Sequence, residues 1–158
     1  MVSVKEAASA FLANNRIAVT GVSRKAQGHG SNAVYKRLRD RGYEVFAVNP
    51  NAEEVEGDFC YHDLKSIPGG VDAVVIATRP DAVAATMREC AELGIKQTWM
   101  HRSFGEGSVC DDATVYGREH GITVIDGGCP LMFDPIADLG HKVMRFVFTR
   151  SGKVPKTV

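Results

Sequence analysis

Five short apolar runs are spaced along the chain, and each is followed by a loop that opens with polar, glycine or proline residues. Segments with helical periodicity lie between most of the runs, and this alternation predicts a parallel sheet covered by helices on both faces. Residues 17–19 and 73–77 are apolar at every position, as strands buried on both faces are. The sequence therefore predicts a single α/β domain with a doubly wound sheet of five parallel strands. The five expected strands are Ile17–Val22, Tyr43–Val48, Val71–Ala77, Ile95–Met100 and Ile122–Ile125.

The predicted helices begin and end at residues that favour helix termini. Ser3 with Glu6 forms the capping-box pattern, which predicts a helix over residues 4–13. Asp81 and Ser108 are the predicted N-caps of two later helices. Glycines at positions 42, 94 and 121 are each expected to end a helix. The helix that ends before Gly42 is expected over residues 31–41. The last helix is expected near residues 136–148, followed by a tail over 149–158 that is either frayed or packed on a partner chain.

The chain of 158 residues has no net charge, because 19 Lys and Arg residues balance 19 Asp and Glu residues. It therefore lacks the overall field that draws a protein to nucleic acid or to an anionic membrane, and we expect neither as a partner. Residues 1–6 lack the pattern of a signal peptide, and no run approaches the roughly 20 apolar residues of a membrane span. The four cysteines are scattered without a C-x-x-C pair. These features predict a cytoplasmic protein with reduced thiols.

The loops that follow the five runs are expected to form one binding site. The carboxyl ends of parallel strands lie along one edge of the sheet, and ligands bind there at the point where the strand order reverses. The first loop carries two cations, Arg24 and Lys25, and the next helix is expected to begin near Ser31 and Asn32. The free backbone N–H groups at a helix N-terminus favour phosphate. The sequence therefore predicts a nucleotide-like ligand whose phosphates lie near this loop.

The same region departs from the pattern of an NAD site. Gly21, Gly28 and Gly30 are too widely spaced for the G-x-G-x-x-G turn around a pyrophosphate. An NAD site also has an Asp or Glu at the end of the second strand to hold the ribose. Asn49 and Pro50 occupy that position here. An uncharged Asn tolerates a ribose phosphate that a carboxylate would repel.

Three segments of the chain resemble one protein family. They are Val19–Ser23, Val71–Ile76 and the segment Gly42–Pro50, which has the pattern G-Y-x-V-x-x-V-N-P. Together they look like the stand-alone coenzyme A-binding proteins, which share the fold of the N-terminal domain of the succinyl-CoA synthetase α subunit. The likeness covers roughly residues 15–130. It implies a Rossmann-like coenzyme A-binding domain over residues 1–148.

The resemblance also implies where each part of the ligand lies. Gly21, Ser23 and Lys25 would contact phosphate. The adenosine would pack at residues 48–50, and the pantetheine would pass residues 78–80. Together with the loops described above, the candidate binding residues are Gly21, Val22, Ser23, Arg24, Lys25, Ser31, Asn32, Val48, Asn49, Pro50, Thr78, Arg79, Pro80 and His101.

Three functions fit these features. The first is binding of coenzyme A or an acyl-coenzyme A without catalysis, because no recognisable set of catalytic residues is present. The second is an NAD(P)-dependent oxidoreductase that uses His101, a position where the family commonly has Gln. The third is a regulatory module that senses acyl-coenzyme A and docks on a partner protein. A homodimer is a further alternative for its assembly.

Other residues of reactive types are expected to have structural roles. Cys129 is predicted to be a small buried hydrophobe and Trp99 a core residue. His141 is expected at the surface or in packing. We expect no metal site, because the spacing matches no compact zinc pattern in the set His101, Cys110, His120, Asp126 and Cys129.

Overall fold

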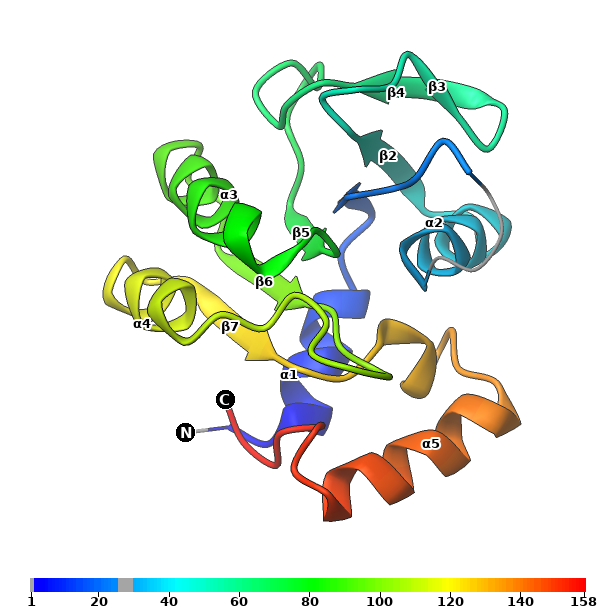
Figure 1. The fold of residues 1–158 in the computed structure, drawn as a ribbon, viewed down its shortest axis with the longest axis vertical. Coiled ribbons are helices and arrows are strands. Elements are labelled where there is room, and N and C mark those ends of the chain that lie inside the picture. Colours follow the sequence, from blue (N-terminus) through cyan, green and yellow to red (C-terminus); the bar gives the residue numbers. More distant parts are fainter. Residues whose placement is uncertain (1, 26–29) are drawn as a thin grey trace.

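The computed structural model describes residues 2–25 and 30–158, and its centre is a seven-stranded sheet (Figure 1). The strands follow the spatial order β3-β4-β2-β1-β5-β6-β7, so the chain order reverses between β1 and β5. Neighbouring strands are parallel except for the antiparallel pair β3 and β4. The strands are β1 Arg16–Thr20, β2 Glu44–Val48, β3 Glu54–Val55, β4 Asp58–Tyr61, β5 Ala73–Ile76, β6 Gln97–Met100 and β7 Thr123–Asp126.

The doubly wound α/β fold is confirmed, but the sheet is larger than the five strands expected. β1, β2, β5, β6 and β7 are the predicted strands, and β3 and β4 are additions. β4 joins β2 through only two residue pairs, Ala47 with Cys60 and Val48 with Tyr61. β3 has two residues. Strands this short at the edge of a sheet lack the apolar run by which the central strands are recognised.

Helices cover both faces of this sheet, as the alternation of elements predicts. Figure 1 shows α3 and α4 on one side and α1, α2 and α5 on the other. Two separate groups of buried side chains follow this division. One includes Phe11, Leu38 and Trp99, and the other includes Val74 and Met87. The helices are α1 Val4–Leu12, α2 Gly30–Asp40, α3 Pro80–Glu92, α4 Asp111–Glu119, the 3₁₀ turn η1 Pro130–Met132 and α5 Leu139–Arg150.

The structure confirms one predicted helix cap and corrects two. The Ser3 hydroxyl accepts the Glu6 backbone N–H and the Glu6 carboxylate accepts the Ser3 backbone N–H, which completes the capping box. Asp81 is not the N-cap of α3, because Pro80 already opens the helix and places Asp81 in its first turn. Ser108 is not the N-cap of α4, which begins three residues later at Asp111. The hydroxyl of Ser108 instead donates to the carbonyl oxygen of Thr78.

The segment after α5 returns to the start of its own chain, so the expectation of a frayed tail is wrong. The Val4 N–H donates to the Lys156 carbonyl at 3.0 Å, and the Val158 N–H donates to the Val2 carbonyl at 3.0 Å. Val154 is buried in the core. Backbone pairing with α1 and burial of one side chain therefore hold residues 151–158 on their own chain. Among the described helices, none is both long enough and apolar enough to span a membrane.

Candidate functional site

A cleft of about 940 Å³ lies at the carboxyl edge of the sheet, across the point where the strand order reverses. Its walls come from the loops after β1, β2, β4, β5 and β6 and from the outer face of α3. Clefts of several hundred Å³ at this position in α/β proteins bind small molecules and nucleotides. Most of the predicted binding residues line it, namely Gly21, Ser23, Ser31, Val48, Asn49, Pro50, Thr78, Arg79, Pro80 and His101.

Four predicted residues do not line this cleft. The Val22 side chain is fully buried in the core, so only its backbone is available to a ligand. The Asn32 side chain is also buried. Arg24 and Lys25 line a smaller adjoining depression of about 370 Å³, which shares Ser23 and Asn49 with the cleft. The two cations are therefore next to the cleft rather than inside it.

The structure also adds lining residues that the sequence pattern does not identify. His62 and Asp63 follow the unpredicted strand β4, and Ser108 comes from the loop before α4. Five more lie on α3, among them Thr86 and Glu89, and the others are Thr20, Gly30, Ala77 and Gly107. His62 and Asp63 reach the cleft because β4 pairs with β2. This strand pairing is seen only in the folded chain.

Asn32 fixes the loop that follows β1. Its Oδ1 accepts the Ser23 N–H at 2.8 Å, and its Nδ2 donates to the Ser23 carbonyl at 2.9 Å. The same Nδ2 donates to Glu56 Oε1 at 2.8 Å, which ties the loop to the turn between β3 and β4. Asn49 Nδ2 adds a hydrogen bond of 2.9 Å to the Val22 carbonyl. The amides of Asn32 and Asn49 therefore hold the first loop in one conformation beside the cleft.

Two glycines allow close approach of the elements that form the cleft. Gly21 has φ +76°, and a Cβ atom there would lie 2.4 Å from the Ala77 carbonyl oxygen. The loops after β1 and β5 therefore touch at Gly21, where L residues are disfavoured both by backbone conformation and by space. At the start of α2, a Cβ on Gly30 would lie 2.9 Å from His101 Cε1. The imidazole of His101 thus packs against the first residue of α2.

His101 is buried at the end of β6, with 9% of the residue exposed. Burial, together with a smaller effect of the nearby His141, lowers the pKa of its imidazole to about 4. The ring is therefore neutral at pH 7. Its Nε2 and the hydroxyl of Thr78 are buried polar atoms without a hydrogen-bond partner among the described residues. Unpaired polar atoms inside a protein cost free energy, and those in a cleft are commonly satisfied by a ligand or by water.

The other residues of reactive types have structural roles. Cys129 is buried, as predicted, and burial raises the pKa of its thiol to about 12. Trp99 is a core residue, as predicted, and its indole N–H donates to the Gly127 carbonyl at 2.9 Å. His141 Nδ1 lies 2.7 Å from Asp138 Oδ2 at the start of α5. Within residues 2–25 and 30–158, no three His, Cys, Asp or Glu side chains converge on a common point.

The family of the chain follows from comparison with known proteins. Residues 15–135 match the family model described as a CoA binding domain, and the chain belongs to that family. The uncharacterized protein YneT of Bacillus subtilis is 32% identical over 116 residues, which cover 73% of this chain and 82% of that protein. Among solved structures, a hypothetical protein from Pyrococcus horikoshii OT3 has a TM-score of 0.74 at 26% identity. That similarity covers 81% of this chain and 87% of the other.

A third relative is a much larger enzyme. The ADP-forming acetate–CoA ligase II of Archaeoglobus fulgidus is 38% identical over 82 residues. The match covers 51% of this chain but only 12% of the ligase. The shared part is therefore a small section of the ligase.

Proposed function

Starting from membership of the CoA binding domain family, we propose that the protein binds coenzyme A or an acyl-coenzyme A in the cleft at the carboxyl edge of the sheet. The observation that carries this proposal is the uncharged end of β2. Asn49 lies in the cleft where an NAD enzyme has a carboxylate, and its side-chain amide makes two hydrogen bonds within the protein. Its Nδ2 donates to the Val22 carbonyl, and its Oδ1 accepts the Asn51 N–H at 2.8 Å. No negative charge from this residue opposes a phosphorylated ribose.

The residues of the cleft fit the parts of coenzyme A. Phosphate is favoured beside the N-terminus of α2, where Gly21 and Ser23 lie, with Arg24 and Lys25 in the adjoining depression. The adenosine would occupy the β2 end, at residues 48–50. The cleft then crosses β1 and β5, so the pantetheine and any acyl group would extend toward residues 78–80 and His101. The unpaired atoms Thr78 Oγ1 and His101 Nε2 match the amide and carbonyl groups that this end of the ligand would bring.

The alternative of an oxidoreductase that uses His101 has less support. A general acid or base is most effective when its pKa is near the working pH. Burial holds the pKa of His101 at about 4. The imidazole would therefore be a poor proton donor at neutral pH, and its single N–H suits a hydrogen bond to a bound ligand. We propose a binding role without catalysis.

Calorimetric titration of coenzyme A, acetyl-coenzyme A and NAD into the protein tests the ligand class. Coenzyme A and its thioester should bind well and NAD weakly, because β2 lacks the carboxylate that holds the NAD ribose. At a coenzyme A concentration about 100 times its dissociation constant, the folded state should gain about 2.7 kcal/mol. Tighter binding of NAD than of coenzyme A would refute the proposal and favour the oxidoreductase.

Asn49→Asp tests the observation that carries the proposal. Two unit charges about 5 Å apart at an effective dielectric constant near 20 repel by about 3 kcal/mol, which lowers affinity by roughly 100-fold or more. The matched control is Asn15→Asp, an exposed position at the opposite edge of the sheet. The control should bind coenzyme A normally. Equal affinity of the two variants would show that the ribose phosphate does not lie near β2.

The double substitution Arg24→Ala and Lys25→Ala tests the phosphate end. Coenzyme A affinity should fall, and its dependence on salt should become weaker, because both cations are screened by added ions. Stability should change by less than about 0.5 kcal/mol, since both residues lie in an exposed loop. Unchanged affinity in low salt would mean that the phosphates bind elsewhere.

A further inference from the structure

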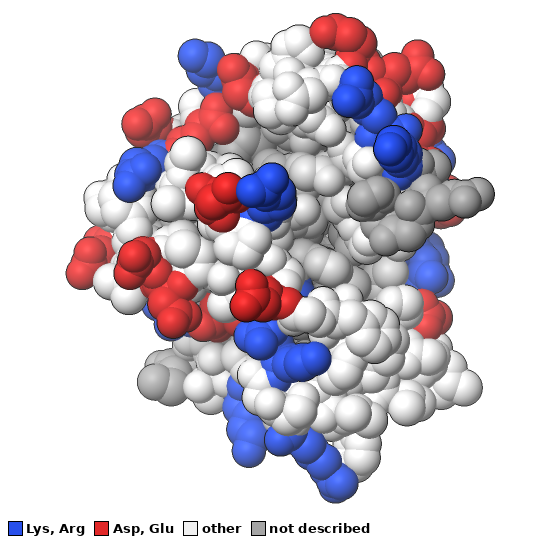
Figure 2. Space-filling model, viewed as in Figure 1, with Lys and Arg blue, Asp and Glu red and all other residues white. Residues whose placement is uncertain are grey.

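The cleft at the carboxyl edge of the sheet has few large apolar side chains. Of the described residues that line it, only Val48 has an aliphatic side chain larger than that of Ala or Pro, and it lies at the β2 end. Figure 2, in the view of Figure 1, shows a hollow between α2 and α3, with charged side chains mainly around the rim of this face. A long acyl chain requires an apolar wall, because each methylene group removed from water raises affinity by about 4-fold. The side chains of the cleft do not form such a wall.

The β6 end of the cleft is lined by small and polar residues. They are Gly30, Thr78, His101, Gly107 and Ser108. The Ser108 N–H donates to the His101 carbonyl at 2.8 Å, and the Ser108 hydroxyl donates to the Thr78 carbonyl. A Cβ atom on Gly107 would lie 2.5 Å from the His101 carbonyl oxygen. The loop before α4 is therefore in direct contact with the segments that follow β5 and β6, and its backbone closes this end of the cleft.

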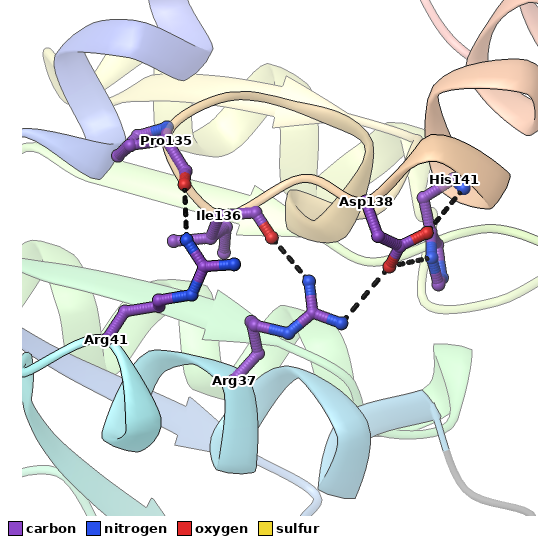
Figure 3. Close-up of polar contacts among 6 residues, drawn as sticks. All are labelled: Arg37, Arg41, Pro135, Ile136, Asp138 and His141. Carbon is purple, nitrogen blue, oxygen red and sulfur yellow. Dashed lines mark hydrogen bonds and ion pairs between the residues drawn. The ribbon is translucent and has the colours of Figure 1, made fainter.

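Another wall of the β6 end is the start of α2, and the domain holds this helix in place. The His101 ring packs against Gly30, the first residue of α2. Figure 3 shows two arginines of the same helix, Arg37 and Arg41, that bind residues 135–138. Each donates to a backbone carbonyl of that segment, at 2.6 and 3.0 Å, and Arg37 also pairs with the only carboxylate of the segment at 3.1 Å. These contacts oppose any movement of α2 away from His101 that would make room for a larger ligand.

Two polar atoms at the β6 end have no hydrogen-bond partner among the described residues. They are Nε2 of His101, a residue that is 9% exposed, and the hydroxyl oxygen of Thr78. The neutral imidazole of His101 donates a hydrogen bond from Nε2 in the tautomer that carries the proton there. A buried donor that is left without an acceptor costs free energy. A ligand that brings an acceptor to this point is therefore favoured.

The free and the acylated forms of coenzyme A differ in what they bring to the β6 end. A free thiol is a weak donor and a weak acceptor, whereas the carbonyl oxygen of a thioester is a good acceptor. A short acyl group adds this oxygen with few methylene groups. A long acyl chain adds the same oxygen together with an apolar tail that the closed and polar end would have to accommodate. The β6 end therefore suits a short acyl group better than it suits a free thiol or a long chain.

From the closed and polar β6 end we infer that the protein selects coenzyme A thioesters of short acyl groups, such as acetyl, over both free coenzyme A and thioesters of longer chains. The inference rests on the proposed function, which directs the pantetheine toward residues 78–80 and His101. The acyl carbonyl oxygen accepts the hydrogen bond from His101 Nε2, and the loop that carries Gly107 and Ser108 limits the length of the alkyl part. His101 is thus the residue that determines which acyl group is preferred.

Calorimetric titration of the wild-type protein with coenzyme A, acetyl-coenzyme A and octanoyl-coenzyme A tests the inference. Acetyl-coenzyme A should bind about 3- to 10-fold more tightly than coenzyme A, which is the effect of one hydrogen bond. Octanoyl-coenzyme A should bind at least about 10-fold more weakly than acetyl-coenzyme A, because the closed end resists overpacking. If octanoyl-coenzyme A or free coenzyme A binds as tightly as the acetyl form or more tightly, the inference is overturned while the proposed function stands. If none of the three binds, the proposed function itself is refuted and the inference falls with it.

Substitutions of His101 test its role in this preference. His101→Leu keeps an apolar bulk but removes the N–H, so the preference for acetyl-coenzyme A over coenzyme A should disappear, whereas His101→Gln keeps an N–H donor and should retain it. The matched control is His62→Leu at the β4 end of the same cleft, which should change both affinities alike and leave their ratio as in the wild type. Melting curves show whether each variant is folded, and the wild-type titrations decide the inference where a variant is not. A ratio that is unchanged in His101→Leu, or lost equally in His62→Leu, overturns the role of His101.

Discussion

Acidification from pH 7.5 to pH 5 is expected to destabilise the protein through His101. The pKa of a histidine in an unfolded chain is about 6.5. Burial lowers the pKa of His101 in the folded protein to about 4. Between these two values the unfolded state binds a proton that the folded state does not. Stability is therefore full above about pH 6.5 and falls as the pH falls toward 4.

The size of the effect follows from the two pKa values. At pH 5 the unfolded imidazole is about 97% protonated and the folded one about 10%, which favours the unfolded state by about 2 kcal/mol relative to pH 7.5. For a domain of this size, 1 kcal/mol shifts the melting temperature by about 2–4 °C. His101 alone should therefore lower the melting temperature by about 4–8 °C over this range.

The assay compares the wild-type protein with His101→Gln. Gln keeps polar atoms in the site but does not titrate, so the difference between the two pH profiles isolates His101 from the other histidines, including the neighbouring His141. Chemical unfolding at pH 7.5, 6.5, 5.5 and 5.0 gives the free energy of unfolding of each protein. The loss between pH 7.5 and pH 5 should be about 2 kcal/mol smaller in the variant. Parallel profiles would show that His101 is not held neutral by burial.

Two further substitutions test the loop after β1. Asn32→Ala removes the amide that binds Ser23 and should lower the free energy of unfolding by about 1–3 kcal/mol. The control is Asn51→Ala at an exposed position, and both variants are measured by chemical unfolding. An equal loss of stability in the two variants would contradict the role given to Asn32. Gly21→Ala should cost about 3 kcal/mol or more, because the left-handed backbone costs an L residue about 1–2 kcal/mol and the new Cβ would overlap the Ala77 carbonyl. Gly42 has the same positive φ, but a Cβ there would have no neighbour within 4 Å. In thermal melts Gly42→Ala should therefore lose only the stability that the left-handed backbone costs. An equal loss at both positions would show that the Cβ at position 21 does not overlap the Ala77 carbonyl.

The sequence by itself determined the elements whose signals are local. The central strands are apolar at consecutive positions because both of their faces are covered, and that pattern can be read without a structure. The capping box at Ser3 and Glu6 depends on residues three apart, and it forms as predicted. The edge of the sheet that carries the cleft follows from the direction of parallel strands. The uncharged residue at the end of β2 is likewise a property of one position, Asn49.

Only the tertiary structure decided which distant residues meet. β4 has four residues and only two of them pair with β2. A segment this short has no local pattern that distinguishes a strand from a loop. Glu56 reaches Asn32 only because the β3–β4 hairpin folds beside α2, and Ser108 binds the Thr78 carbonyl instead of capping a helix. The tail lies on α1 because Val154 finds a place in the core. Local patterns record the periodicity and chemistry of neighbouring residues, whereas these contacts join residues far apart in sequence, and their partners are selected by the packing of the whole chain.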